Sequence, residues 1–205
     1  MPRSATLALA LLAAVALAGG PARAAATDEA TAVVRSTVDD ALAVLRDRTR
    51  SSDARRTDVE RIAYAHFDFE TISRLVLARN WPKLSAAQQQ AFIAEFKRHL
   101  TLTYWKTLED YRNQKVEVDG ARAEKNGDVT VRSNIEGERS APIRLDYRMR
   151  PAGGTYVVID VIIEGVSLVQ NFRAQTQEII AKDGVDALIA KLKERNDERD
   201  RESGG

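Results

Sequence analysis

The stretch that decides the fold is residues 156–168, YVVIDVIIEGVSL. Its first eight residues are apolar apart from Asp160, which predicts a central strand covered on both faces of its sheet. Ser167 then predicts the start of a helix over residues 166–182, because its hydroxyl can accept a hydrogen bond from an exposed backbone N–H group. The chain is therefore expected to pass directly from its most buried strand into a helix.

Upstream of this stretch, from Lys115 onward, apolar residues recur with a period of two. The clearest case is residues 143–149, where apolar side chains alternate with charged ones. Turns that contain glycine separate successive strands, at 126–128, 136–139 and 153–154. The pattern predicts a twisted antiparallel sheet that ends in the strand 156–163.

The first half of the chain and its C-terminal end have a helical period instead. Thr27 is expected to cap the first helix, and Ser85 with Gln88 to form a capping box on the longest one. Trp81-Pro82 and Gly184 are expected to interrupt helices. The predicted helices, besides 166–182, are residues 28–50, 53–65, 69–78, 86–111 and 185–195.

The N-terminus predicts export. Residues 1–3 form a short basic start, residues 5–18 are apolar, and Ala22-Arg23-Ala24 fits a cleavage site, so residues 1–24 are expected to be a cleaved signal peptide. The apolar run is too short to span a membrane. We therefore expect a periplasmic protein with a single domain over residues 25–195. The charged residues 196–205, which end in Ser-Gly-Gly, are expected to be a disordered tail.

Composition excludes several classes of protein. The 205 residues include 31 Lys+Arg and 30 Asp+Glu, and this even balance argues against nucleic-acid binding and against a polybasic membrane anchor. The chain has no cysteine, which excludes a disulfide framework and a lipoprotein anchor. Packing alone must therefore hold the fold together.

Catalytic and metal-binding patterns are weak. The two histidines, His66 and His99, lie on different predicted elements and outside any ligand-spacing motif, so both are interpreted as structural. Ser167 lacks the second glycine of a nucleophile elbow and is interpreted as a helix cap. Asp160 and Glu164, four residues apart on a strand, would be about 13 Å apart, which exceeds the spacing of a glycosidase pair. We expect no catalytic residue, no metal and no cofactor.

The remaining feature is a large amount of apolar and aromatic surface on amphipathic helices and a twisted sheet. Such elements form an ordinary filled core in most proteins, but they can also enclose an apolar cavity for a small molecule. Periodicity does not distinguish these two arrangements.

Several motifs resemble the periplasmic phospholipid-shuttle family, called the MlaC or toluene-tolerance family. The most specific is Asp160-x-x-x-Glu164-Gly-Val-Ser167, followed by Asn171-Phe-Arg173-Ala-Gln175. Others are 67–69, 75–81, the Phe92/Phe96/Leu100/Tyr104 repeat, 111–118, 143–148 and 184–192. The resemblance covers about residues 30–195. Ala78 and Thr176 depart from it, where the family often has glycine and an aromatic residue.

The resemblance implies an α+β fold, in which helices wrap around a four-stranded, strongly twisted antiparallel sheet and enclose an apolar cavity for phospholipid tails. It also implies a soluble carrier that shuttles lipid between the outer and inner membranes and maintains outer-membrane lipid asymmetry. The implied partners are an outer-membrane lipoprotein–porin complex and an inner-membrane ABC transporter with an MCE-domain subunit. Bound phospholipid would be cargo, and the family has no catalytic group.

Face assignments combined with the resemblance predict the residues that line the cavity. They are Phe69, Ile72, Leu75, Val76, Phe92, Phe96, Leu100, Tyr104, Ile143, Leu145, Tyr147, Val161, Ile163 and Val166. Asp160, Glu164 and Arg173 are expected to fix the last strand to its helix. Three alternatives stay open: a carrier of another lipid such as a hopanoid, an enzyme with a cone-shaped α+β pocket, and a lipid-free interaction module.

Overall fold

The computed structural model describes residues 20–111, 114–137 and 141–203. These residues form an α+β fold with one antiparallel sheet in the order β1-β2-β3-β4-β5. The helices are α1 (Gly20–Arg46), α2 (Ser52–His66), α3 (Phe69–Leu77), η1 (Ala78–Lys83), α4 (Ala86–Glu109), α5 (Leu168–Asp183) and α6 (Val185–Ser203). The strands are β1 (Lys115–Ala123), β2 (Val129–Glu136), β3 (Ile143–Ala152), β4 (Thr155–Ile163) and β5 (Val166–Ser167).

The described sheet has five strands rather than the four that were expected. Glu164 and Gly165 adopt φ angles of 50° and 81°, so they reverse the chain tightly at the end of β4. Val166 then pairs with Ile163, and Ser167 with Ile162. The following helix therefore starts at Leu168, two residues later than predicted. Ser167 caps it as expected, because its hydroxyl accepts a hydrogen bond from the Gln170 N–H group.

The helical first half of the chain also differs from the expectation, at the start of α1 and around Trp81-Pro82. Helix α1 begins at Gly20 rather than residue 28, and Thr27 is no cap, since its hydroxyl donates to the Arg23 and Ala24 carbonyls inside the helix. The predicted cleavage position after Ala24 thus lies within α1, and residues 1–19 of the predicted signal peptide lie outside the described residues. Helix α3 ends at Leu77, because Ala78 adopts a φ angle of 48°. Trp81-Pro82, predicted as a stop, lies inside the separate 3₁₀ helix η1, which ends at Lys83.

Helix α4 begins as the sequence predicts. The Ser85 hydroxyl accepts from the Gln88 N–H group, and the Gln88 side chain accepts from the Ser85 N–H group, which confirms the capping box.

At the C-terminal end of the chain the structure differs from the expected tail, because α6 continues from residue 195 to Ser203. Asn196 is completely buried within this extension.

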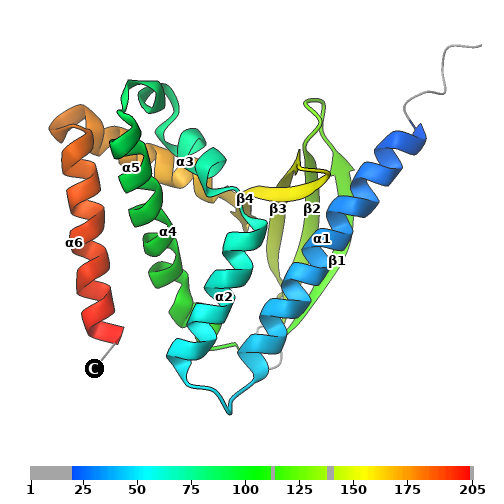
Figure 1. Ribbon diagram of the computed structural model, residues 1–205. Helices are drawn as coiled ribbons and strands as arrows, with labels where there is room; N and C mark the ends of the chain where they lie inside the picture. The colour runs from blue at the N-terminus through cyan, green and yellow to red at the C-terminus, as the bar shows by residue number, and fades with distance from the viewer. Residues whose placement is uncertain (1–19, 112–113, 138–140, 204–205) are drawn as a thin grey trace, which may run out of the picture.

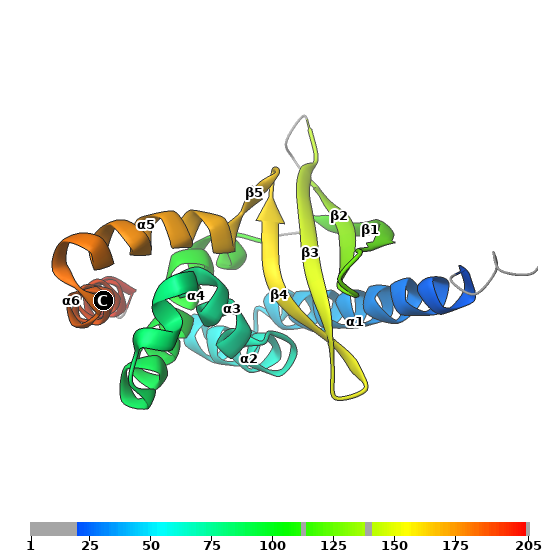
Figure 2. The same ribbon diagram turned by 90° about the horizontal axis from the view of Figure 1, so that it is seen from above.

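The helices are unevenly distributed around the sheet. Figure 1 shows α1 running along the sheet and α4 beside α6, and Figure 2 shows α5 and α6 gathered beyond the β5 edge. Helix α1 contacts β1, β2 and β4, and both α3 and α5 contact β4. The outer edge of β4 is also held by the link between α2 and α3, since the Asp68 N–H group donates to the Val158 carbonyl at 3.0 Å.

The buried apolar residues fall into three clusters rather than one continuous core. The helical cluster joins α3, η1, α4, α5 and α6, and contains Ile72, Val76, Leu77, Trp81, Leu84, Phe92, Phe96, Val169, Phe172, Leu188 and Leu192. The α1–sheet cluster contains Ala30, Val34, Val129, Val131, Met149, Tyr156 and Val158. The α1–α4 cluster contains Leu42, Leu45, Trp105 and Tyr111.

Candidate functional site

The candidate site is the part of the sheet that these clusters leave partly exposed. Strand alternation places one set of apolar side chains on the face that α1 partly covers. We call this set the open inner face: it comprises Ile135, Ile143, Leu145, Tyr147, Val161 and Ile163, all partly exposed. Within the described chain, Ile135, Ile143, Leu145 and Ile163 belong to none of the three buried clusters.

The strand register explains why this face is only half covered. Leu145 pairs with Ser133 and Ile163, and two residues further along β3 Tyr147 pairs with Val131 and Val161. Two residues further again, Met149 is completely buried in the α1–sheet cluster. One continuous apolar face is therefore closed by α1 at the Met149 end and left open at the Leu145 end.

Tyr147 lies where the open inner face meets the α1–sheet cluster. Burial raises the pKa of its phenol to about 12, although the side chain keeps some contact with solvent. Burial also raises the pKa of Tyr104, a partly exposed residue of α4.

Helix α4 carries a second partly exposed apolar row. Leu100, Tyr104 and Leu108 lie at spacings of four residues, which places them along one side of the helix. Leu108 is 38% exposed, and Leu100 packs against the edge of the helical cluster. The residues predicted to line the cavity include Leu100 and Tyr104 but not Leu108, which continues the same spacing.

The structure separates the predicted cavity residues into three groups. Ile72, Val76, Phe92 and Phe96 lie inside the helical cluster, where Phe92 stacks on Phe96 with ring centroids 5.3 Å apart. Phe69, Leu75 and Leu100 pack against that cluster, and Tyr104 is partly exposed beside it on α4. The five predicted residues on β3 and β4 form most of the open inner face, while Val166 is 56% exposed on β5. Contact of any of these residues with a lipid stays a prediction.

Polar groups near the site have structural partners. The Asp160 carboxylate accepts from the Ser167 hydroxyl at 2.6 Å and from the Val169 N–H group at 3.1 Å, so it fixes β4 to the start of α5 as expected. Glu164 was also expected to fix β4 to its helix, but its carboxylate accepts from the Arg144 N–H group and therefore joins β4 to β3. Arg173 has a different role from the predicted one, because it donates to the Leu75 carbonyl at 2.8 Å and joins α5 to α3.

Neither a cluster of possible metal ligands nor a helix that could span a membrane occurs in the described part of the chain. Across residues 20–111, 114–137 and 141–203, no three His, Asp or Glu side chains gather as a metal site would require. His99 is buried, with its Nδ1 atom 3.0 Å from the Asn196 side-chain oxygen. None of the helices in these ranges has the length and apolar character needed to cross a bilayer.

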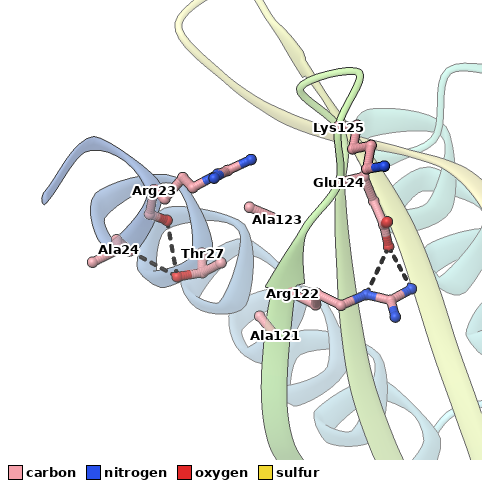
Figure 3. A pocket seen from close by; sticks show the side chains of 8 residues that line it. All are labelled: Arg23, Ala24, Thr27, Ala121, Arg122, Ala123, Glu124 and Lys125. Carbon is pink, nitrogen blue, oxygen red and sulfur yellow. Dashed lines mark hydrogen bonds and ion pairs between the residues drawn. The ribbon is translucent and has the colours of Figure 1, made fainter. Parts of the chain in front are cut away.

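An open pocket of about 640 Å³ lies elsewhere, between the first turns of α1 and the β1–β2 hairpin (Figure 3). Its lining is largely small or charged, and includes Arg23, Ala24, Arg122 and Glu124. Arg23 and Ala24 belong to the predicted signal peptide, so cleavage would remove one wall of this pocket. It is therefore a poor candidate for the functional site.

Comparison with known proteins places the chain in a family. A sequence model described as "MlaC protein" matches residues 35–194. Toluene tolerance protein ttg2D of Pseudomonas putida is 29% identical over 120 residues, which cover 58% of this chain and 56% of that protein. The intermembrane phospholipid transport system binding protein MlaC of Haemophilus influenzae is 27% identical over 143 residues, which cover 68% of this chain and 67% of that protein. The match thus spans little more than half the length of the first relative.

A solved structure agrees with the sequence match. The phospholipid-binding protein from Ralstonia solanacearum, in complex with a phospholipid at 1.53 Å resolution, has a TM-score of 0.76 and 30% identity. The similarity covers 83% of this chain and 98% of that one. With the family model matched over most of the length and the fold shared with this structure, the chain belongs to the MlaC family.

Proposed function

We propose that this protein is a periplasmic carrier that binds the acyl chains of a phospholipid against the open inner face and shuttles the lipid between the outer and inner membranes. The observation that carries the proposal is a set of partly exposed apolar residues on β3 and β4, Ile143, Leu145 and Ile163, that lie outside the packed clusters. An apolar surface of this kind is stabilised when an acyl chain covers it.

The relatives support the choice of ligand. The Ralstonia protein is in complex with a phospholipid, and the Haemophilus protein is named as the binding protein of an intermembrane phospholipid transport system. The Ralstonia protein shares its fold with most of this chain. We therefore infer that this chain also binds the acyl chains of a phospholipid, against its own sheet. The cavity itself, and its closure around the tails, is part of our proposal.

Physical chemistry explains why such a carrier is needed. Moving one CH₂ group from a membrane into water costs about 0.8 kcal/mol, so two chains of about 15 methylenes would cost on the order of 24 kcal/mol. A protein surface that covers the tails removes most of this cost. Release at a membrane then requires a partner that favours the emptied state, because affinity for lipid alone does not give transport.

The proposed partners follow from family membership. They are an outer-membrane lipoprotein–porin complex and an inner-membrane ABC transporter with an MCE-domain subunit. We propose no catalytic step and no cofactor: both oxygens of the Asp160 carboxylate already accept hydrogen bonds, which leaves this buried acid poorly placed as a general base. Phospholipid is the proposed cargo, and a hopanoid would use the same apolar surface.

The test is a charge placed on the open inner face. Leu145→Asp and Ile163→Asp each introduce a carboxylate at one of two paired positions, where desolvation by an acyl chain would be costly. After purification without detergent, we expect both variants to lose the phospholipid that the wild type carries, as measured by extraction and mass spectrometry.

Ala152→Asp is the matched control, since it introduces the same charge at the exposed end of the same strand. It should retain wild-type lipid content. If Leu145→Asp melts cooperatively and keeps its lipid, the assignment of the site to this face is wrong.

A further inference from the structure

The interface between α4 and α6 changes character along its length. Near the start of α6, Leu188 and Leu192 are buried in the helical cluster. One turn later the same side of α6 carries Asn196, and from there the described contacts with α4 are polar. This polar part begins two residues beyond the segment that the family model matches, residues 35–194.

The Asn196 side chain is 0% exposed, and both its Nδ2 and its Oδ1 atoms have hydrogen-bond partners. Its Nδ2 group donates to the Glu95 carbonyl and to the Glu95 carboxylate, each at 2.9 Å. Its Oδ1 atom lies 3.0 Å from His99 Nδ1. One side chain thus satisfies groups that are one turn apart on α4. A buried polar contact of this kind is favourable in only one alignment of the two helices, because any other leaves buried groups without partners.

Neighbouring pairs restrict α4 in the same way. The Arg98 guanidinium donates to Asp197 at 2.7 Å and to Asp200 at 2.9 Å, and Arg199 donates to the Thr103 hydroxyl. All of these α4 residues lie on the side that faces α6. We call the set of α4–α6 contacts made by Asn196, Asp197, Arg199 and Asp200 the polar anchor.

Two residues of the partly exposed row of α4 point away from the groups that contact Asn196. At 3.6 residues per turn, Tyr104 and Leu108 lie about 140–180° around the helix axis from Glu95 and His99. A rotation of α4 about its axis would turn this row away from its present direction. The polar anchor therefore acts together with the buried Phe92, Phe96 and Trp105 to hold the side chains that α4 presents on the side away from α6.

We propose that Asn196 is a positioning residue for lipid binding: through the polar anchor it fixes the rotation of α4, so that Tyr104 and Leu108 contact the bound acyl chain. This inference rests on the proposed function and adds α4 to the binding surface. It assigns a role to a segment that the sequence pattern alone predicts to be a disordered tail.

The experiment is photocrosslinking with the full chain. A photoreactive phenylalanine analogue replaces Tyr104, and in a parallel sample Lys106, which is exposed. Each protein is loaded from vesicles of phosphatidylethanolamine and phosphatidylglycerol, and the crosslinked lipid is measured by mass spectrometry. We expect a strong lipid adduct at position 104 and little at position 106.

Asn196→Ala should then reduce the lipid adduct at position 104 several-fold. The variant should still unfold cooperatively, and its open inner face should be unchanged. Glu198→Ala, on an exposed position of α6, is the control and should leave the adduct unchanged. The same photoreactive analogue at Tyr147, on the open inner face, should give an unchanged lipid adduct in Asn196→Ala. A loss of adduct confined to position 104 distinguishes positioning of α4 from a general loss of stability.

The outcomes separate this inference from the proposed function. A wild-type chain that takes up no lipid would contradict the proposed function. A wild-type chain that holds lipid, with an adduct at position 104 that Asn196→Ala does not change, would overturn the positioning role alone. If Asn196→Ala does not fold, Arg98→Ala tests the same anchor, because its partners Asp197 and Asp200 are 42% and 38% exposed.

Discussion

The helical cluster and the open inner face are built from similar residue types but differ in what covers them. In the helical cluster, Val76, Leu77 and Phe92 are completely buried, because α3, α4, α5 and α6 supply side chains from several directions. On the open inner face, Leu145 and Ile163 pair with each other across two strands, and no buried cluster closes over them.

This difference shows that hydrophobicity alone does not identify a binding surface. An apolar residue that is buried in a cluster contributes to the stability of the fold. An apolar residue on the open inner face, which no buried cluster covers, can instead stabilise a bound ligand. The same strand contains both kinds, since Met149 is closed by α1 and Leu145 is not. Substitutions in the two regions should therefore have different effects on stability and on lipid content.

The largest expected effect on stability is in the helical cluster. Phe92 is 0% exposed and stacks on Phe96, so Phe92→Ala should lower the free energy of unfolding by about 3–5 kcal/mol. Urea unfolding followed by circular dichroism measures this change. A loss below about 1 kcal/mol would mean that this cluster is loosely packed, and the contrast between the two regions would fail.

The closed end of the sheet should show the next largest effect. Burial tends to raise the pKa of Asp128, but hydrogen bonds from Arg150, with N–O distances of 2.9 Å, and from Asn126 outweigh burial and hold the pKa below its ordinary value. The resulting stability is present above about pH 4 and is lost as the pH falls through the folded-state pKa.

Arg150→Ala leaves the buried Asp128 carboxylate without this partner, so it should lower the free energy of unfolding at pH 7. We expect a loss of about 1–3 kcal/mol, limited because solvent screens the partly exposed guanidinium. It should also reduce the loss of stability between pH 4 and pH 2, measured by thermal melting. An unchanged acid profile would show that this pair does not hold the closed end.

A helix cap provides a smaller effect that leaves both regions intact. Ser85→Ala removes the capping box of α4 and should cost about 1 kcal/mol. Lipid content should not change, because the cap lies at the exposed start of the helix. Chemical denaturation and lipid extraction on the same sample test both statements, and a loss of lipid here would show that overall stability controls loading.

The smallest expected effect on stability is on the open inner face. Leu145→Ala removes a side chain that is only partly buried, so it should cost less than about 1 kcal/mol. Its lipid content should nevertheless fall below that of the wild type and of Ser85→Ala. If Leu145→Ala destabilises the protein as much as Phe92→Ala does, Leu145 belongs to a filled core.

Much of the fold could be predicted from the sequence, because local patterns determine it. The strand over residues 143–149, the capping box at Ser85 and the helix end at Gly184 each depend on neighbouring residues, and the structure confirms them. The turn at Glu164-Gly165 was not recognised, because a positive φ at a glutamate is not visible in hydrophobic periodicity. The fifth strand was missed for this reason.

The candidate site could be predicted only in part. Periodicity identifies which face of a helix or strand is apolar, but the element that covers this face is a property of the tertiary fold. Phe92 and Leu145 were therefore predicted as equivalent lining residues, although one is buried and the other is not. Asn196 was missed because it lies in a charged segment, yet it continues the four-residue spacing of Leu188 and Leu192, which could have indicated it.

The most direct test of the central claim is native mass spectrometry of the wild-type protein purified from the periplasm without detergent, followed by lipid identification after denaturation. We predict an added mass that resolves to phospholipid and disappears in Leu145→Asp. An added mass that resolves to a hopanoid would still identify a lipid carrier, with a hopanoid rather than a phospholipid as its cargo. A clean apo mass that persists after incubation with phospholipid vesicles would contradict the account, because the uncovered apolar face would then bind no lipid.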